Sequence, residues 1–200
     1  MGERGDADAI AARRDEFAAA SKLGTVALRR FEPGDVAAVH RWFNNEKATR
    51  TLVVQRKSFS TTEAEDWVRR AIRGGEDRKY AILVDGHREP VGFTALYGLR
   101  RESGPELGAL IGDDVRSQGL GRRAEALTLH KAFDEFGADR VYGEIPAFNE
   151  RAKRAVAGLG WRYEELLPDH GQRNGKSFDC ELWAVVRPDF YGAVAALDLD

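Results

Sequence analysis

The spacing of hydrophobic residues along the chain separates segments with strand periodicity from segments with helical periodicity. Val26 and Leu28 lie two residues apart, which places both on one face of a half-buried strand. Val36, Val39 and Phe43 recur three and then four residues apart, which is the spacing of one helix face. The turn sequence Glu-Pro-Gly-Asp between them marks a helix start. The pattern therefore predicts a strand over 25–31 and a helix over 35–44.

A second helix is expected after the stretch 46–59, which shows no clear period and is expected to form a loop. Ser60 and Glu63 have the spacing of a capping box, which marks the start of this helix. Gly74 permits the left-handed conformation that ends many helices. The predicted apolar face consists of Trp67, Val68, Ala71 and Ile72.

The second half of the chain combines short strands with two further helices. Strands are predicted over 79–85, 91–99, 106–112, 140–148, 161–167 and 180–186, and helices over 121–136 and 149–160. The polar segment 168–177 is expected to form a loop between the last two strands. Three successive strands without intervening helices favour a mixed α+β sheet over a doubly wound parallel one. The predicted fold class is thus α+β, with about seven strands and about four helices.

Composition narrows the class of protein without changing this outline. The 200 residues and 22.2 kDa suit one domain. The 31 Lys and Arg nearly balance the 33 Asp and Glu, and the net charge of −2 argues against a nucleic-acid partner. No apolar run approaches the roughly 18 residues of a membrane-spanning helix, so no membrane partner is expected. The single cysteine, Cys180, cannot form an internal disulfide, which favours a reducing, cytoplasmic location.

The main domain is expected to span residues 25–190. Residues 1–24 precede it as an N-terminal extension, in which Ile10 and Phe17 suit a short amphipathic helix and a frayed tail is the alternative. Residues 191–200 are expected to form a C-terminal tail.

The sequence RSQGLG at 116–121 has the features of an anion site between a predicted strand and a long helix. The first N–H groups of a helix have no intrahelical partner, and the helix dipole adds partial positive charge. Gly119 and Gly121 lack a Cβ atom, so an anion can approach the main chain, and Arg116, Arg122 and Arg123 add positive charge. The segment predicts a phosphate or pyrophosphate cradle; a tight turn before an ordinary helix is the plain alternative.

The same glycines also imitate a dinucleotide-binding fingerprint. GLGRRA at 119–124 fits G-x-G-x-x-A, and Glu144 follows about 25 residues after Gly119 at a strand, as in a nicotinamide-dependent oxidoreductase. Two features count against this alternative. The residues DDVRSQ separate the strand from the first glycine, and repeated strand–helix–strand units do not follow.

Four motifs in order make the chain resemble the GNAT acetyltransferase superfamily. RSQGLG matches the Q/R-x-x-G-x-G/A acetyl-CoA motif, and the segment from Asn149 to Trp161 resembles a second family segment with an Asn start and a Gly-Phe/Trp end. The opening LRRFEPGDVAAVHRWFNN and the closing LWAVVRPDF are similar to the RimJ/RimL-type branch, the ribosomal-protein N-acetyltransferases. The likeness runs from about Thr25 to Phe190.

This resemblance implies the GNAT acyltransferase fold, with a central, mostly antiparallel mixed sheet, and acetyl-CoA as co-substrate without a metal. Backbone amides of the 116–121 loop would hold the pyrophosphate, and the strand at 106–112 would hydrogen-bond the pantetheine arm. That strand and the one at 140–148 would splay apart to admit the thioester, with an amide near Ile111 stabilising the oxyanion. Asn149 would contact the pantetheine, cap the next helix, or both. The residues implied in cofactor binding are Leu110, Ile111, Arg116, Ser117, Gln118, Gly119, Leu120, Gly121, Arg122 and Asn149.

The implied chemistry needs a proton acceptor, because an alkylamine attacks a thioester only in its neutral form. The resemblance places Glu144 first and Glu106 second for this role. Many family members carry a tyrosine general acid in the 149–161 segment, whereas this chain has Val156 there. Tyr142, on the same strand face as Glu144, is the substitute if it faces the slot; otherwise solvent or another group protonates the thiolate.

The expected acceptor is a primary amine: a protein N-terminus, or a small amine such as a polyamine, aminoglycoside or amino sugar. By resemblance, the first two helices and the loops 46–59 and 168–177 form its site, with Trp42, Phe43 and Asn44 as candidate contacts. The valine at the tyrosine position leaves a catalytically silent CoA-binding regulatory module as an alternative. The family's habit favours a homodimer, for which the apolar segment 190–197 is available. The four histidines lack metal-ligand spacing.

Overall fold

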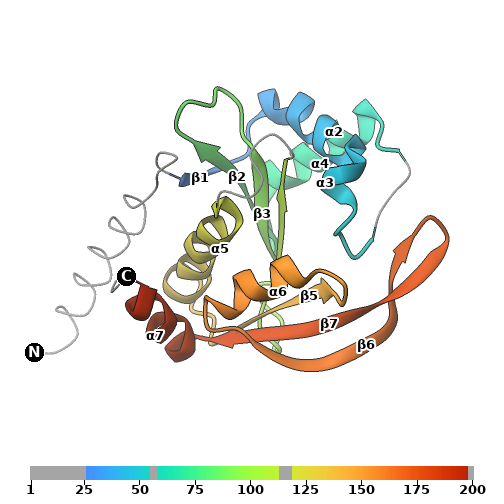
Figure 1. The fold of residues 1–200 in the computed structure, drawn as a ribbon. Helices are drawn as coiled ribbons and strands as arrows, with labels where there is room; N and C mark the ends of the chain where they lie inside the picture. Colours follow the sequence, from blue (N-terminus) through green and yellow to red (C-terminus); the bar gives the residue numbers. More distant parts are fainter. Residues whose placement is uncertain (1–25, 55–57, 113–118, 198–200) are drawn as a thin grey trace, which may run out of the picture.

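A seven-stranded mixed sheet forms the centre of the computed structural model, which describes residues 26–54, 58–112 and 119–197 (Figure 1). The strand order is β1-β2-β3-β4-β5-β7-β6, and every neighbouring pair is antiparallel except β4 and β5. This confirms the predicted α+β class and excludes a doubly wound parallel sheet. The strands are β1 (Val26–Arg30), β2 (Arg78–Val84), β3 (Gly92–Tyr97), β4 (Glu106–Ile111), β5 (Arg140–Pro146), β6 (Arg162–Arg173) and β7 (Lys176–Val186).

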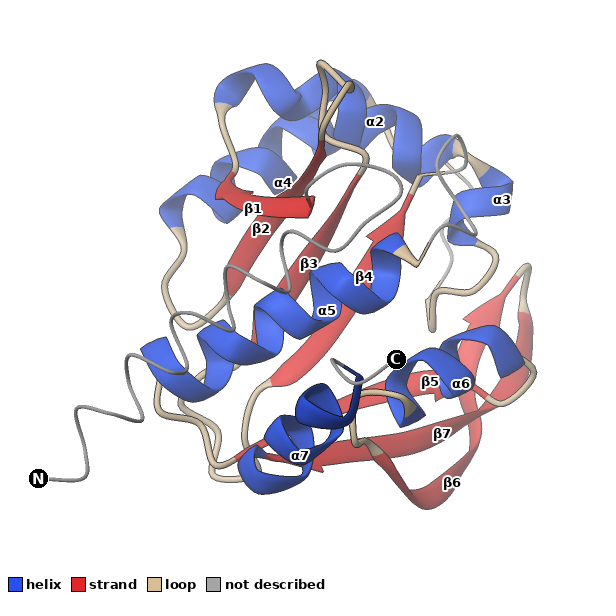
Figure 2. Ribbon diagram, turned by 60° about the vertical axis from the view of Figure 1, so that its left-hand side comes forward, coloured by secondary structure: helices blue, strands red, loops and turns tan. Residues whose placement is uncertain are grey.

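Helices cover both faces of the sheet (Figures 1 and 2). One face carries α2, α3 and α4, and the other carries α5, α6 and α7. A 3-10 turn, η1 (Pro33–Asp35), precedes α2, and a π-helical turn, η3 (Lys131–Glu135), continues α5. The helices are α2 (Val36–Asn44), α3 (Glu46–Thr49), α4 (Thr61–Arg73), α5 (Leu120–His130), α6 (Glu150–Ala157) and α7 (Arg187–Leu197).

The local signals read from the sequence act as expected at the start of α4. Ser60 Oγ accepts a hydrogen bond from the Glu63 N–H at 3.2 Å, and the Glu63 carboxylate accepts one from the Ser60 N–H at 2.8 Å. This capping box confirms the predicted helix start. In the predicted apolar face, Val68 and Ala71 are buried, but Ile72 is 39% exposed.

The parallel strands β4 and β5 stay together only at their beginnings. Their one registered residue pair joins Glu106 to Tyr142, and the Tyr142 N–H donates to the Pro105 carbonyl at 3.1 Å. Beyond this point β4 and β5 diverge, as Figure 2 shows. The splay confirms the expected slot, and it leaves the inner edge of β4 open along 107–111.

Two segments expected to be loops contain regular structure. Within 46–59, α3 forms because the Asn45 side chain accepts hydrogen bonds from the backbone N–H groups of Lys47 and Ala48. A four-residue helix is too short to show a hydrophobic period. The prediction of a wholly irregular segment was therefore wrong.

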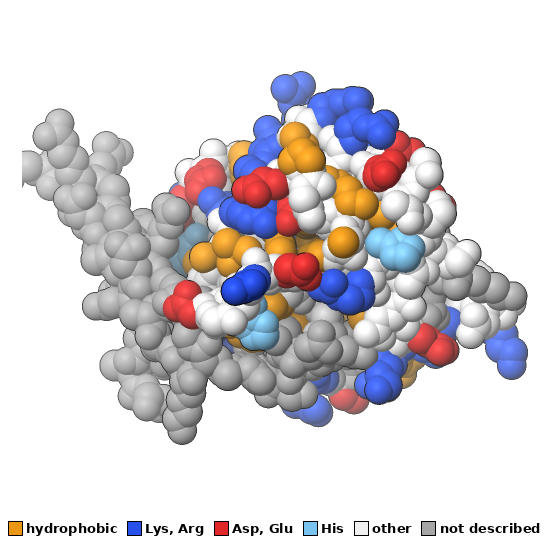
Figure 3. Space-filling view, turned by 90° about the horizontal axis from the view of Figure 1, so that it is seen from above, with side chains coloured by type: hydrophobic (Ala, Val, Ile, Leu, Met, Phe, Trp, Pro, Cys, Tyr) orange, Lys and Arg blue, Asp and Glu red, His pale blue; other side chains and the backbone are white. Residues whose placement is uncertain are grey.

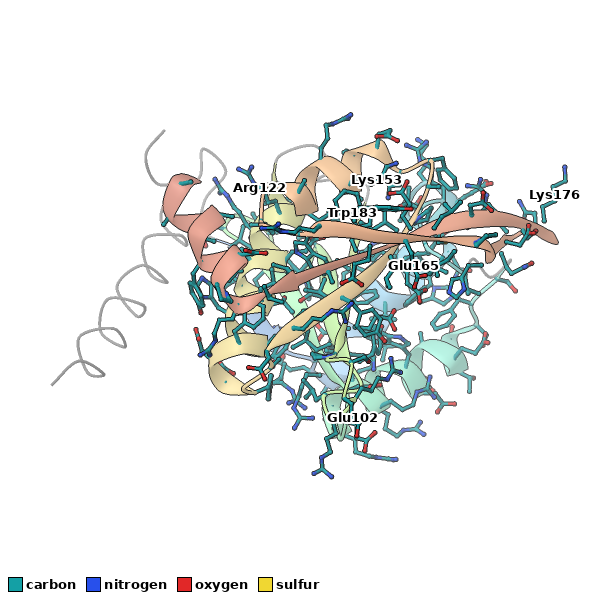
Figure 4. All side chains as sticks on the ribbon, turned by 90° about the horizontal axis from the view of Figure 1, so that it is seen from below. Glu102, Arg122, Lys153, Glu165, Lys176 and Trp183 are labelled. Carbon is teal, nitrogen blue, oxygen red and sulfur yellow. The ribbon has the colours of Figure 1, made fainter. Side chains whose placement is uncertain are left out.

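The prediction of a loop over 168–177 was also wrong. Most of this segment belongs to β6 and β7, which form one long hairpin. Only Asn174 and Gly175 form its turn, and both have positive φ, 52° and 76°. Most side chains of β6 are exposed, so the strand carries no alternation of hydrophobic and polar residues. Lys176 marks the tip of this hairpin in Figure 4.

The end of the chain differs from the expected tail. Helix α7 continues to Leu197, and Phe190 and Val194 are buried in the core with Phe133 and Val141. These residues of the apolar segment 190–197 are therefore used within the chain itself. The N-terminal extension 1–24 lies outside the described residues.

The surface seen from above carries Lys and Arg side chains interspersed with Asp and Glu side chains, with hydrophobic side chains exposed between them (Figure 3). Neither sign of charge dominates this face. No helix in the described part of the chain is long and apolar enough to cross a membrane.

Candidate functional site

Two cavities meet beside the splayed strands. The first, of about 600 Å³, runs from the start of α5 past α3 and α6, and we call it the α5 groove. The second, of about 520 Å³, lies between α2, α4 and the divergent strands, and we call it the aromatic cavity. The residues that line both, here called the junction, are Thr51, Leu52, Ala109, Glu125, Asn149 and Ala152.

The α5 groove has the geometry of an anion site at its helical end. Gly119 is the N-cap of α5 with φ +78°, and a Cβ atom there would meet nothing within 4 Å. At Gly121 a Cβ atom would meet only Ile111 Cγ1, at 3.8 Å. The open main chain at the positive end of the helix suits a phosphate group. The basic residues lining the groove are Lys47, Arg50, Arg122 and Arg151.

Most residues expected to bind the cofactor line this groove. Leu110 and Ile111 supply the end of β4, and Asn149 lies opposite at the start of α6. The Asn149 side chain accepts a hydrogen bond from the Ala152 N–H at 3.3 Å, so it caps α6 and lines the junction at once. Gly119, Leu120, Gly121 and Arg122 also line the groove, whereas Arg116, Ser117 and Gln118 lie outside the described residues.

Aromatic rings form one wall of the second cavity. The ring centroids of Phe43 and Phe59 are 4.6 Å apart, and those of Trp67 and Phe93 are 5.0 Å apart. Tyr97 adds a fifth ring to the lining. This wall offers a large apolar contact area to a ligand.

Of the three residues expected to contact the acceptor, only Phe43 lines the cavity. Trp42 is 3% exposed and packs against Phe93, so it belongs to the core. Asn44 binds the backbone of Phe59, donating to its carbonyl at 2.7 Å and accepting from its N–H at 3.0 Å. Asn44 therefore holds the end of the loop that carries Phe59.

Two carboxylates line the strand side of the aromatic cavity, Glu106 on β4 and Glu144 on β5. Burial, together with the negative charge of Glu144, raises the pKa of Glu106 above its ordinary value. Glu144 has a partner that the sequence did not suggest: its Oε2 lies 2.8 Å from Nε2 of His170. Because β6 continues through the segment expected to be a loop, it brings His170 to Glu144 across the intervening strand β7.

Tyr142, the third catalytic candidate, has a different neighbour. Its hydroxyl accepts a hydrogen bond from Nη1 of Arg101 at 2.6 Å, and its side chain lines neither cavity. The same Arg101 atom lies 3.6 Å from Oε2 of Glu106. The shared strand face with Glu144 thus does not bring Tyr142 into the cavity.

The end of β6, near the tip of the β6–β7 hairpin, is hydrogen-bonded to the loop that follows α3. The Gln172 N–H donates to the Val53 carbonyl at 2.9 Å, and Arg173 Nη1 donates to the Arg50 carbonyl at 2.8 Å. Val54 and Gln172 also form an isolated parallel bridge. Residues 51–54, which line the aromatic cavity, are therefore held by β6.

Glu125 is a further titratable residue of the site that the sequence analysis did not single out. It lies on α5 at the junction, and its Oε2 atom is buried without a hydrogen-bond partner among the described residues. Burial raises the pKa of this carboxyl to about 7. In the sequence, only its position one helical turn after Gly121 could have indicated that it faces the groove.

Cys180 is fully buried and has no disulfide partner. Burial raises the pKa of its thiol to about 11, so the thiolate is scarce at neutral pH. The arrangement thus offers an anion-binding groove, an aromatic cavity and carboxylates where the two meet. Such a site can bring a long phosphorylated ligand and a cationic ligand together for proton-coupled group transfer.

Comparison with known proteins agrees with this geometry. A family model described as an acetyltransferase (GNAT) domain matches residues 25–162. The N-acetyltransferase YoaA of Bacillus subtilis, itself uncharacterized, is 23% identical over 80% of this chain and 93% of its own length.

Solved structures share the fold. Spermidine N-acetyltransferase from Vibrio cholerae, in complex with CoA and spermine, superposes with a TM-score of 0.76 at 18% identity, covering 83% of this chain and 98% of that one. RimJ from Mycobacterium smegmatis, in complex with CoA-disulfide, gives 0.74 at 21% identity, covering 86% and 90%.

Proposed function

The chain belongs to the acetyltransferase (GNAT) domain family and is an N-acetyltransferase. We propose that its acceptor is a primary amine attached to an apolar group. The observation that carries this proposal is the aromatic cavity, in which Glu106 and Glu144 face a wall of rings that includes Phe43 and Trp67. A protonated amine is attracted to the carboxylates, and an apolar group gains by leaving water against the rings. The first residue of a polypeptide and a compact small amine both have this form.

The α5 groove would hold acetyl-CoA. Backbone N–H groups in the first turn of α5, beginning at Leu120 and Gly121, would bind the diphosphate with help from Arg122. The pantetheine arm would lie along the open edge of β4 near Leu110 and Ile111, like an added strand. This placement brings the thioester to the junction, where the acceptor cavity begins.

Glu144 is the proposed proton acceptor. A free alkylamine has a pKa near 10, so it must lose a proton before or during attack on the thioester. Glu144 lines the cavity, and the contact with His170 orients its carboxylate. Glu106 is the second candidate: it also lines the cavity, and its Oε2 atom lies 3.6 Å from Nη1 of Arg101.

A polyamine such as spermine, which is bound in the Vibrio cholerae structure, is the second candidate acceptor. Glu106 and Glu144 line the cavity and would attract its charges. The aromatic wall favours an acceptor with an apolar group instead. Release of CoA thiol from acetyl-CoA, measured with spermidine, phenethylamine, glucosamine, kanamycin and short peptides beginning with Phe or Ser, separates these classes.

Two alternatives give different results in the same assay. A silent CoA-binding module would bind acetyl-CoA without releasing thiol to any amine. A nicotinamide-dependent oxidoreductase would bind NADH, and the mixed sheet argues against it. A cytoplasmic location, membership of the RimJ/RimL-type branch and a homodimer remain proposals. Because Phe190 and Val194 are buried, a dimer would need another surface.

A further inference from the structure

Among the described residues, Glu125 is the only ionisable side chain that lines both the α5 groove and the aromatic cavity. The other five described junction residues are Thr51, Leu52, Ala109, Asn149 and Ala152. If the cofactor enters by the groove and the amine by the cavity, the bond that breaks must lie at this junction. Glu125 is thus the titratable group that geometry places nearest to the leaving group.

Helix α5 directs Glu125 along the path of the cofactor. Gly121 and Glu125 are four residues apart on one face of α5, so their Cα atoms are separated by about 6 Å along the helix axis. Gly121 lies at the proposed diphosphate end, and both residues line the groove. Glu125 therefore lies farther along the groove, toward the cavity that holds Glu144.

Leaving-group chemistry calls for an acid at this position. When the C–S bond breaks, sulfur leaves as a thiolate, which takes up a proton at neutral pH because thiols ionise near pH 8.5. On α6, Val156 lines the cavity and has no proton to give. Tyr142 lines neither cavity. Neither Tyr142 on β5 nor Val156 on α6 can therefore donate a proton at the junction.

We propose that Glu125, in its neutral form, donates the proton that the departing CoA sulfur accepts. This inference rests on the proposed acetyl transfer. The amine nitrogen forms a bond to the carbonyl carbon, and its proton passes to Glu144. The C–S bond breaks, and sulfur takes the proton of Glu125. A proton then returns through water from Glu144 to Glu125, so that neither residue is changed over the cycle.

The surroundings of Glu125 favour the neutral form that this role needs. Its Oε2 atom is buried and has no hydrogen-bond partner among the described residues, and burial is the cause of its raised pKa. The carboxyl is thus protonated in a substantial fraction of molecules at neutral pH. The charged or titratable groups that line the two cavities around it are Lys47, Arg50, Arg122 and Arg151 in the groove and Arg70, Tyr97, Glu106 and Glu144 in the cavity, with His170 beside Glu144.

The first test needs no acceptor. If the acetyl group covers the neutral carboxyl, acetyl-CoA binding is linked to a proton on Glu125. Calorimetric titration of acetyl-CoA into the wild-type chain should give about tenfold weaker binding at pH 8 than at pH 6, and Glu125→Gln should reduce this ratio markedly. A pH dependence identical in both proteins would overturn the placement of Glu125 beside the thioester.

The second test measures the role itself. With the amine from the acceptor panel that releases thiol fastest, Glu125→Gln should lower kcat about 100-fold while KM for acetyl-CoA stays within about twofold. The wild type should lose activity above pH 7, and Glu125→Gln should not show this loss. Glu125→Asp, which retains an acid, should recover part of the rate. An unchanged kcat and pH profile in Glu125→Gln would contradict the proposal.

A matched control separates local chemistry from damage to the fold. Glu102 is exposed, lines neither cavity and lies well away from Arg122 in Figure 4. Glu102→Gln should leave kcat and the pH dependence of binding unchanged. If the wild-type chain neither binds acetyl-CoA nor releases thiol, the proposed function fails. If it does both and Glu125→Gln behaves like wild type, the further inference alone fails.

Discussion

His170 Nε2 lies 2.8 Å from Oε2 of Glu144, so an outer strand of the sheet supports a carboxylate in the aromatic cavity. The contact joins β6 to β5 across β7. Because the Gln172 N–H bonds the Val53 carbonyl, the same hairpin also holds the loop that lines the cavity. Movement of the hairpin would therefore change both the orientation of the base and the shape of the acceptor site.

Glu144→Gln should lower kcat by about 100-fold or more, because the amide cannot accept the proton of the amine. Acetyl-CoA affinity should stay within about twofold, since Glu144 does not line the α5 groove. Steady-state kinetics and calorimetry check the two quantities. The exposed Glu165→Gln on β6 is the control. A normal kcat in Glu144→Gln would show that Glu144 is not the proton acceptor, and Glu106 would be the next candidate.

His170→Asn should lower kcat about tenfold through loss of orientation at Glu144, with little effect on KM for acetyl-CoA. In the Glu144→Gln background, the same substitution should have almost no further effect, because the two residues act as a unit. The double-mutant cycle measured by thiol release tests this. Independent, multiplicative losses would show that His170 does not act through Glu144.

Gly121→Asp should abolish acetyl-CoA binding, because it adds a negative charge where the groove is expected to hold the diphosphate. Gly121→Ala should fold normally, since its Cβ would meet only Ile111 Cγ1 at an ordinary contact distance of 3.8 Å. Thermal shift with and without acetyl-CoA compares the two variants. Equal stabilisation of both by acetyl-CoA would place the diphosphate elsewhere.

Glu125 should make stability depend on pH in a defined direction. Its carboxyl titrates at about 7 in the folded chain against an ordinary value of 4.5, so the folded state binds more protons between these values. The free energy of unfolding should therefore lose about 3 kcal/mol as pH rises through this window.

Urea denaturation of wild type and Glu125→Gln at several pH values isolates this contribution. The difference between the two proteins should change between pH 4.5 and 7 and stay constant at higher pH. A constant difference over the whole range would mean that Glu125 is not held neutral by burial.

The elements predicted correctly depend on local signals. The capping box at Ser60 and Glu63, the open glycines at 119 and 121 and the cap at Asn149 are all set by neighbouring residues. The order of the seven strands and of helices α2, α4, α5 and α6 followed from the hydrophobic period together with turn and capping signals. These features need no knowledge of contacts distant in sequence.

The features that were missed depend on contacts distant in sequence. His170 meets Glu144 only because β6 extends through an exposed stretch without a hydrophobic pattern. In the sequence, Glu125 is an isolated acidic residue of a helix. It becomes part of the site only because α5 packs beside the splayed strands. Trp42 and Asn44 lie next to Phe43 in sequence, yet the helix turns them to the core and to the Phe59 backbone.

The central claim is that the junction supports acetyl transfer from acetyl-CoA to a primary amine. The most direct measurement follows CoA thiol release with the amine panel and identifies the product by mass spectrometry. We expect thiol and acetylated amine in equal amounts, fastest with an amine that carries an apolar group, and loss of both in Glu144→Gln. Acetyl-CoA binding without acceptor-dependent thiol release from any amine would contradict the account.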